Sequence, residues 1–116
     1  MGSSGSGEFG NYAPSKEPKC DRPLEFSLEE VARSEFFASN KTVPSPNTSV
    51  RLAPPPPVNG RLVVLDSSSG AVVGLIPTSL NFLLACMGQG YHYSGEVTES
   101  AGGKLPRVTV KLNPAR

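Results

Sequence analysis

The sequence has few of the residues from which catalytic and metal sites are usually built. It contains one histidine, two cysteines and no tryptophan. The lone His92 is too few for a multi-histidine metal site, and the sequence has no G-x-S-x-G nucleophile elbow for a Ser-His-Asp triad. Cys20 and Cys86 are too few for a four-ligand zinc site. We therefore expect a protein that is not an enzyme and that binds no cofactor and no metal.

A large excess of charge of either sign is also missing. Eleven Lys and Arg residues face ten Asp and Glu residues, which gives a formal net charge of +1. A field this weak does not attract nucleic acid or an anionic membrane by electrostatics alone. We therefore expect no nucleic-acid partner.

The cysteines are too few for a disulfide framework. Cys20 lies in a polar leader, whereas Cys86 lies in an apolar run that favours an inert, buried thiol. Disulfides are rare in the cytosol. We therefore expect two reduced thiols in an intracellular, cytoplasmic protein.

Composition divides the chain into five segments. Residues 1–10 are rich in Gly and Ser and look like an expression tag, and residues 11–26 are rich in Pro, Lys and Glu, which is typical of a flexible leader. An amphipathic helix is expected over residues 27–40, and a Pro-rich linker over residues 41–59. A small β domain is expected over residues 60–113.

The helix is predicted to run from about Leu28 to Ser39. Ser27 and Glu30 have the spacing of a capping box, and Asn40 suits the residue that ends a helix. Apolar side chains recur at spacings of three and four and form one stripe; they are Leu28, Val31, Ala32 and Phe36.

Two roles are open for this helix. It either packs on the β domain or binds a partner through Leu28, Val31, Phe36 and Phe37. We expect Phe36 to be the main anchor, because it is the largest side chain of the stripe, whereas Phe37 lies about 100° further round the helix.

The linker contains four consecutive prolines, Pro54 to Pro57, which have no amide hydrogen to donate and favour an extended polyproline II conformation. Such a run is typical of a stiff spacer. The alternative is a docking peptide for an aromatic-lined groove of the SH3, WW or EVH1 kind.

The strongest structural signal is a β-hairpin between Arg61 and Ile76. The continuous apolar run from Leu62 to Leu65 predicts a strand covered on both faces, at the centre of the sheet. Asp66 to Gly70 has the composition of a turn, and Ala71 to Ile76 returns as the second strand.

Three further stretches complete the expected fold. Leu80 to Leu84 is too short for its periodicity to separate helix from strand, and we favour a strand. Tyr91 to Val97 reads as a half-exposed strand, and Arg107 to Leu112 alternates as an edge strand does. The fold class is therefore mainly β, a small antiparallel barrel or sandwich that follows one amphipathic helix and a Pro-rich linker.

The best candidate for a recognition surface is the aromatic sequence Tyr91, His92 and Tyr93. It follows Gly88 and Gly90, which predict a flexible turn. Aromatic side chains beside such a turn are common at protein interfaces.

The hairpin sequence resembles the β segment near the start of some fungal senescence-domain, or spartin-like, proteins. The resemblance lies in a basic residue, an apolar run and an Asp within Gly60 to Asp66, followed by the Gly-x-Val-Val-Gly return of Gly70 to Gly74. Arg107 to Leu112 is similar to the closing strand of that segment, whereas Leu80 to Met87 is more apolar than its counterpart. The resemblance implies an intracellular module associated with membranes or lipid droplets, without catalytic residues.

These patterns lead to two hypotheses about function. The first is a non-enzymatic interaction module that binds a protein or peptide partner through a sheet edge, the aromatic patch or the amphipathic helix. The second is a structural unit whose helix and sheet edge form a homo-oligomer. Membrane association is expected only if the family resemblance holds.

Overall fold

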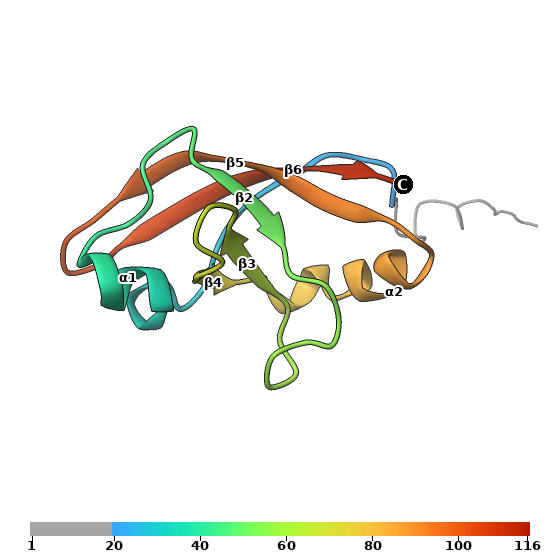
Figure 1. The fold of residues 1–116 in the computed structure, drawn as a ribbon, viewed down its shortest axis with the longest axis horizontal. Helices are drawn as coiled ribbons and strands as arrows, with labels where there is room; N and C mark the ends of the chain where they lie inside the picture. The colour runs from blue at the N-terminus through green and yellow to red at the C-terminus, as the bar shows by residue number, and fades with distance from the viewer. Residues whose placement is uncertain (1–19) are drawn as a thin grey trace, which may run out of the picture.

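Six antiparallel strands form one curled sheet, a half-barrel, in the order β1-β6-β5-β2-β3-β4 (Figure 1). The computed structural model describes residues 20–116. The predicted tag, residues 1–10, and residues 11–19 of the predicted leader lie outside the described residues. The expectation of a mainly β chain is confirmed, and the barrel or sandwich takes the form of this single curled sheet.

Short helical segments lie between β1 and β2 and between β4 and β5. The strands are β1 (Leu24–Ser27), β2 (Ser49–Leu52), β3 (Val63–Asp66), β4 (Val72–Leu75), β5 (His92–Ala101) and β6 (Arg107–Ala115). The helical segments are η2 (Val31–Arg33), α1 (Glu35–Asn40), η3 (Thr78–Leu80) and α2 (Phe82–Gly88).

The long hairpin of β5 and β6 spans the sheet from end to end. Its register runs from His92 opposite Ala115 to Ala101 opposite Arg107. The alternating pattern of the β6 sequence places Val108, Val110 and Leu112 on the core face, where each side chain is 0% exposed. Because β1 pairs with the other side of β6, this strand lies inside the sheet, and its prediction as an edge strand is wrong.

The predicted hairpin between Arg61 and Ile76 is confirmed as β3 and β4. The Asp66 carboxylate accepts hydrogen bonds from the Ser69 amide (3.2 Å) and the Ser69 hydroxyl (2.7 Å), and Gly70 takes a positive φ of 78°. The turn therefore uses Asp66 and Gly70 as their residue types predict. Strand β3 is covered on both faces, as expected, but it lies next to an edge strand and not at the centre.

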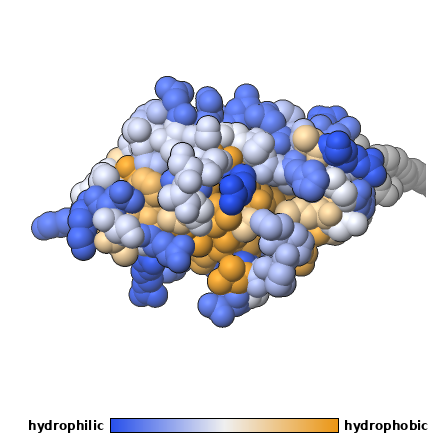
Figure 2. All heavy atoms as spheres, viewed as in Figure 1, coloured by the Kyte–Doolittle hydropathy of each residue, from blue (hydrophilic) through white to orange (hydrophobic). Residues whose placement is uncertain are grey.

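The two edge strands of the sheet are joined by a backbone bridge. After β1, the Leu28 amide donates to the carbonyl oxygen of Val108 on β6 (2.9 Å). Glu29 and Leu75 of β4 then exchange two backbone hydrogen bonds, of 2.9 and 2.8 Å. Beyond this bridge, apolar atoms are exposed in a hollow between α1 and the loop that joins β2 to β3 (Figure 2).

The predicted helix from Leu28 to Ser39 is wrong over its first half. Leu28 continues the β pairing, and Glu30 has a left-handed φ of 57°, which interrupts a right-handed helix. The helix α1 begins only after Ser34, whose hydroxyl accepts a hydrogen bond from the Phe37 amide (3.2 Å). Leu28 and Val31 are apolar residues buried in the core of the sheet, and they do not form one stripe along a helix.

Three other segments also differ from expectation. The predicted strand over Leu80 to Leu84 is replaced by η3 and α2. The predicted leader includes β1, and the predicted linker includes β2. Strand β1 pairs with the distant β6 and β2 with the distant β5, and local composition does not reveal either pairing.

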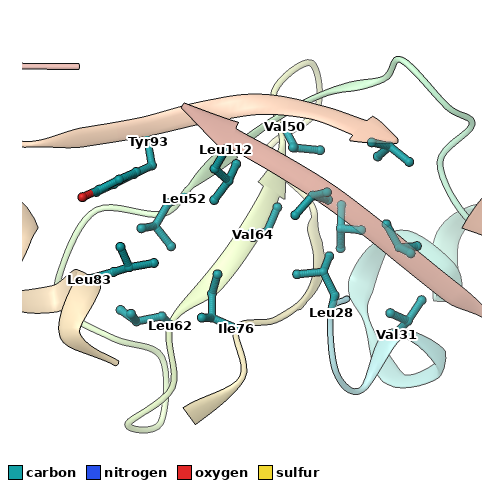
Figure 3. Packing of buried hydrophobic residues seen from close by; sticks show 14 of the residues in the cluster. Leu28, Val31, Val50, Leu52, Leu62, Val64, Ile76, Leu83, Tyr93 and Leu112 are labelled. Atoms are coloured by element: carbon teal, nitrogen blue, oxygen red, sulfur yellow. The ribbon is translucent and has the colours of Figure 1, made fainter. Parts of the chain in front are cut away.

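The core lies in the concave side of the curled sheet. Figure 3 shows Leu28 and Val31 at one end of the core, and Leu83 of α2 beside Tyr93 at the other end. Residues of the inner strands, such as Val64, lie between them. The η2 segment and α2 therefore close the two ends of the half-barrel.

Replacing Gly95 by Ala should destabilise the protein by about 1–3 kcal/mol or more, since overpacking forces neighbouring groups to shift. A Cβ atom on Gly95 would overlap the carbonyl oxygen of Lys111, a backbone atom that cannot swing away. Urea unfolding should show the loss. Gly88→Ala is the control, because no atom lies within 4 Å of the added Cβ; an equal loss in both variants would contradict this account of the β5–β6 contact.

Candidate functional site

Two of the hollows in the described surface that are lined mainly by apolar atoms bear on the predicted site residues. The first lies between α1 and β4 and is called here the α1–β4 groove. The second lies beside the start of β5 and is called the aromatic hollow. They have similar volumes, about 380 and 360 Å³. They differ in how much of their lining is already packed against other parts of the protein.

The α1–β4 groove is formed by the segment from Glu30 to Glu35 on one side and by β4 on the other. Its lining residues are Glu30, Arg33, Ser34, Glu35, Val58, Arg61, Val63, Val72, Gly74 and Leu75. Val58 is 50% exposed, although it is a large apolar residue. The exposed apolar atoms seen between α1 and the β2–β3 loop belong to this region of the surface (Figure 2).

Arg61 is held at the base of the groove. Its Nη2 donates to Glu29 Oε1 (2.6 Å) and to the carbonyl oxygen of Ile76 (2.9 Å). Its Nε is shielded from solvent and has no hydrogen-bond partner among the described residues. The ion pair with Glu29 compensates the charge of the guanidinium, and it fixes the β2–β3 loop to the bridge between the sheet edges.

The other wall is fastened by Glu35 and Ser34. The Glu35 carboxylate accepts a hydrogen bond from the Val72 amide of β4 (2.9 Å), which ties α1 to the sheet. Ser34 is buried and donates its hydroxyl to the carbonyl oxygen of Val31 (2.7 Å). The groove is therefore formed in the free protein by hydrogen bonds from both walls.

The aromatic hollow contains the predicted patch, but most of that patch is in use. Tyr93 is 2% exposed, and its hydroxyl donates to the carbonyl oxygen of Cys20 (2.7 Å). The Tyr91 ring stacks on Tyr93 at 6.4 Å between centroids, and the Arg116 guanidinium lies 4.7 Å from the Tyr91 centroid. Of the three predicted residues only His92 is exposed, which leaves little free aromatic surface.

The predicted helix residues do not join this patch. Leu28 and Val31 are buried in the core, whereas Phe36 and Phe37 are half-buried on α1. Phe36 packs against the core, as its prediction as an anchor requires. Whether any of these residues contacts a partner stays a prediction.

The sequence did not reveal the α1–β4 groove. The Glu29–Leu75 bridge brings the segment from Glu30 to Glu35 beside the hairpin residues between Val58 and Leu75. Val58 and Arg61 lie at the end of the proline run, and nothing in their local pattern indicates a hollow. The one available signal was Arg61 directly before a buried strand, which places a charge beside apolar surface.

The prediction of two reduced thiols is wrong. Cys20 and Cys86 form a disulfide across 66 residues, with Cα atoms 5.5 Å apart. The bond fastens the segment before β1 to α2, and no free cysteine remains. The disulfide could not be predicted from the sequence, because the polar residues around Cys20 do not indicate that it packs against α2.

Two further observations concern the described part of the chain. Among residues 20–116, no group of three or more His, Cys, Asp and Glu residues is placed to hold a metal ion. No helix in the same residues has the length and apolar character needed to cross a bilayer. The predicted cytoplasmic location stays a prediction.

Comparison of the chain with protein-family models, curated proteins and solved structures found no match. The resemblance to senescence-domain proteins stays a prediction.

Loss of the disulfide should lower the free energy of unfolding by about 2–4 kcal/mol, because the bond restricts a long loop in the unfolded chain. We expect a reductant to lower the urea midpoint of the protein, and to leave the double variant Cys20→Ser, Cys86→Ser unchanged. A midpoint that is insensitive to reductant in the unmodified protein would show that the bond does not form.

Stability should fall in alkaline solution through Tyr93. Burial, then the neighbouring Tyr91 and the Asp21 charge, raise the pKa of Tyr93 above its ordinary value of 10.0. Above that pH the unfolded chain releases the proton while the folded protein keeps it, so the free energy of unfolding decreases as the pH rises through the folded pKa.

Urea unfolding measured on either side of pH 10.0 checks this prediction. In the variant Tyr93→Phe the alkaline decrease should be smaller. At neutral pH its free energy of unfolding should be about 1 kcal/mol lower, because the hydrogen bond to Cys20 is missing. Tyr91→Phe removes the second cause of the shift and leaves burial, the largest, in place, so it should keep most of the alkaline decrease. The same alkaline decrease in unmodified protein and in Tyr93→Phe would rule out Tyr93 as the cause.

Proposed function

We propose that this protein is a non-enzymatic interaction module that binds a protein or peptide partner in the α1–β4 groove. The observation that carries the proposal is an exposed apolar surface held open by hydrogen bonds on both sides. Apolar surface that is rimmed by polar groups is typical of interaction sites on soluble proteins. Burial of Val58 alone would remove a large exposed side chain from water.

The aromatic hollow is a weaker candidate for the partner site. Its Tyr91 ring is already covered by Arg116 and stacked on Tyr93, and Tyr93 is bonded to Cys20. A partner would have to displace these internal contacts. The α1–β4 groove requires no such exchange, because Val58 has no comparable cover.

The chemistry of the groove favours binding over catalysis. Its polar residues are carboxylates, arginines and the buried Ser34, whose hydroxyl is engaged with Val31 and Phe37. The lone His92 lies beside the other hollow. A serine nucleophile with a neighbouring histidine base is therefore not assembled in the groove.

The alternative of a self-assembling unit has less support. Strand addition between copies needs a long open sheet edge. Strand β6 is inside the sheet, and the edge strands β1 and β4 are four residues each. We therefore expect light scattering over a concentration series to give the mass of a monomer, and a mass that rises to a stable dimer would favour self-assembly.

A peptide selection tests the proposed site. We expect a displayed random-peptide library to yield binders of the unmodified protein, and the variant Val58→Asp to lose them, because a charge would replace the exposed apolar contact. The backbone bonds between Val58 and Arg61 do not involve the side chain, so the fold should persist. Leu84→Asp, at a position 39% exposed on α2, is the matched control; equal loss of binding in both variants would exclude the groove.

A further inference from the structure

We propose that the α1–β4 groove selects a peptide in which an aliphatic side chain is flanked by a lysine or arginine. This inference rests on the proposed function and specifies the partner of the same site. It follows from three features of the groove: the blocked edge of β4, the apolar lining and the charges on the rim.

The outer edge of β4 cannot pair with an added strand along its length. At one end the Val72 amide is bonded to the Glu35 carboxylate, and at the other end Leu75 exchanges both backbone bonds with Glu29. Main-chain pairing supplies the affinity when a peptide extends a sheet. With both ends of β4 occupied, a partner must bind here through side chains.

The apolar lining of the groove indicates that the partner inserts an aliphatic side chain. Val58, Val72 and Leu75 present apolar atoms to the hollow, and its volume of about 380 Å³ exceeds that of one aliphatic side chain. A Leu, Ile or Met side chain that enters the hollow would contact this apolar lining. Its transfer from water would supply the main part of the affinity.

The rim determines the flanking residue. Arg61 is neutralised by Glu29, to which it donates at 2.6 Å. Arg33 and Glu30 form a longer, exposed pair at 3.6 Å. The Glu35 carboxylate is engaged only with a neutral amide, so its negative charge has no partner in the described structure. Counted with Glu29, which pairs with Arg61, the groove carries three glutamates and two arginines, a net charge of −1 that is left on Glu35. This charge favours a basic group on the peptide.

Glu35 is the position at which this selectivity can be removed. The variant Glu35→Gln keeps an amide oxygen that can accept from the Val72 amide, but it has no charge. Glu25→Gln, on the exposed face of β1, is the control because it removes the same charge away from the groove.

The test uses short peptides that are acetylated and amidated, with one leucine in a Ser-Gly background and either lysines or glutamates beside it. Binding is measured by calorimetry, and the site is read from the methyl NMR signals of Val58, Val72 and Leu75. We expect the lysine peptide to bind roughly twofold to fivefold tighter than the glutamate peptide, as for a partly exposed charge pair. The preference should disappear in Glu35→Gln, persist in Glu25→Gln and decrease with salt.

Three results would count against the inference, and they have different consequences. Equal or tighter binding of the glutamate peptide, with groove methyl shifts, would refute the basic preference and leave the proposed function standing. A persistent lysine preference in Glu35→Gln would also exclude the role of Glu35. If neither peptide shifts the three methyl signals, the groove does not bind such side chains, and the proposed function fails with the inference.

Discussion

Two backbone hydrogen bonds between Glu29 and Leu75 hold the opposite edges of the sheet together. Without them, β1 and β4 would be the free ends of an open six-stranded sheet. The bridge joins the two ends of the curled sheet, and the chain after β1 then crosses the end of the core. Val31 is buried there, and α1 then lies against β4. The contact therefore lies between two walls of the groove, the segment from Glu30 to Glu35 and β4.

The side chains around the bridge strengthen it. Arg61 binds Glu29 and the carbonyl oxygen of Ile76, the residue after Leu75, so it connects both sides of the bridge to the β2–β3 loop. Glu35 makes a second connection from α1 to the Val72 amide. At the far end of the half-barrel, the Cys20–Cys86 disulfide and the Tyr93 hydroxyl fasten the start of the described chain to α2 and β5.

The predictable parts of the fold are those with a local signal. The β3–β4 hairpin could be read from its apolar runs and from the Asp66 to Gly70 turn, and β6 from its strict alternation. Arg107 to Leu112 carried no sign of its position within the sheet, because the partner on its second side is the short β1, more than eighty residues away in sequence.

The sequence predictions that were wrong concern residues whose positions are set by contacts with distant parts of the chain. Leu28 and Val31 showed helical spacing, but one lies in an extended segment and the other in a short 3₁₀ turn, and tertiary burial in the core sets their positions. The aromatic residues Tyr91 and Tyr93 were correctly placed at a strand start, yet their faces are packed internally. The groove combines distant segments, so no single stretch of sequence contained it.

Amide hydrogen exchange at Glu29 and Leu75 is the most direct test of the central claim that the two sheet edges are joined. The Val97 amide, which donates to the Thr48 carbonyl oxygen in the interior of the sheet, is the reference. The account predicts that both bridge amides exchange as slowly as Val97, because all three open only when the sheet unfolds. Fast exchange at Glu29 and Leu75 beside a protected Val97 would show that the edges are not joined and that the groove is not formed in the free protein.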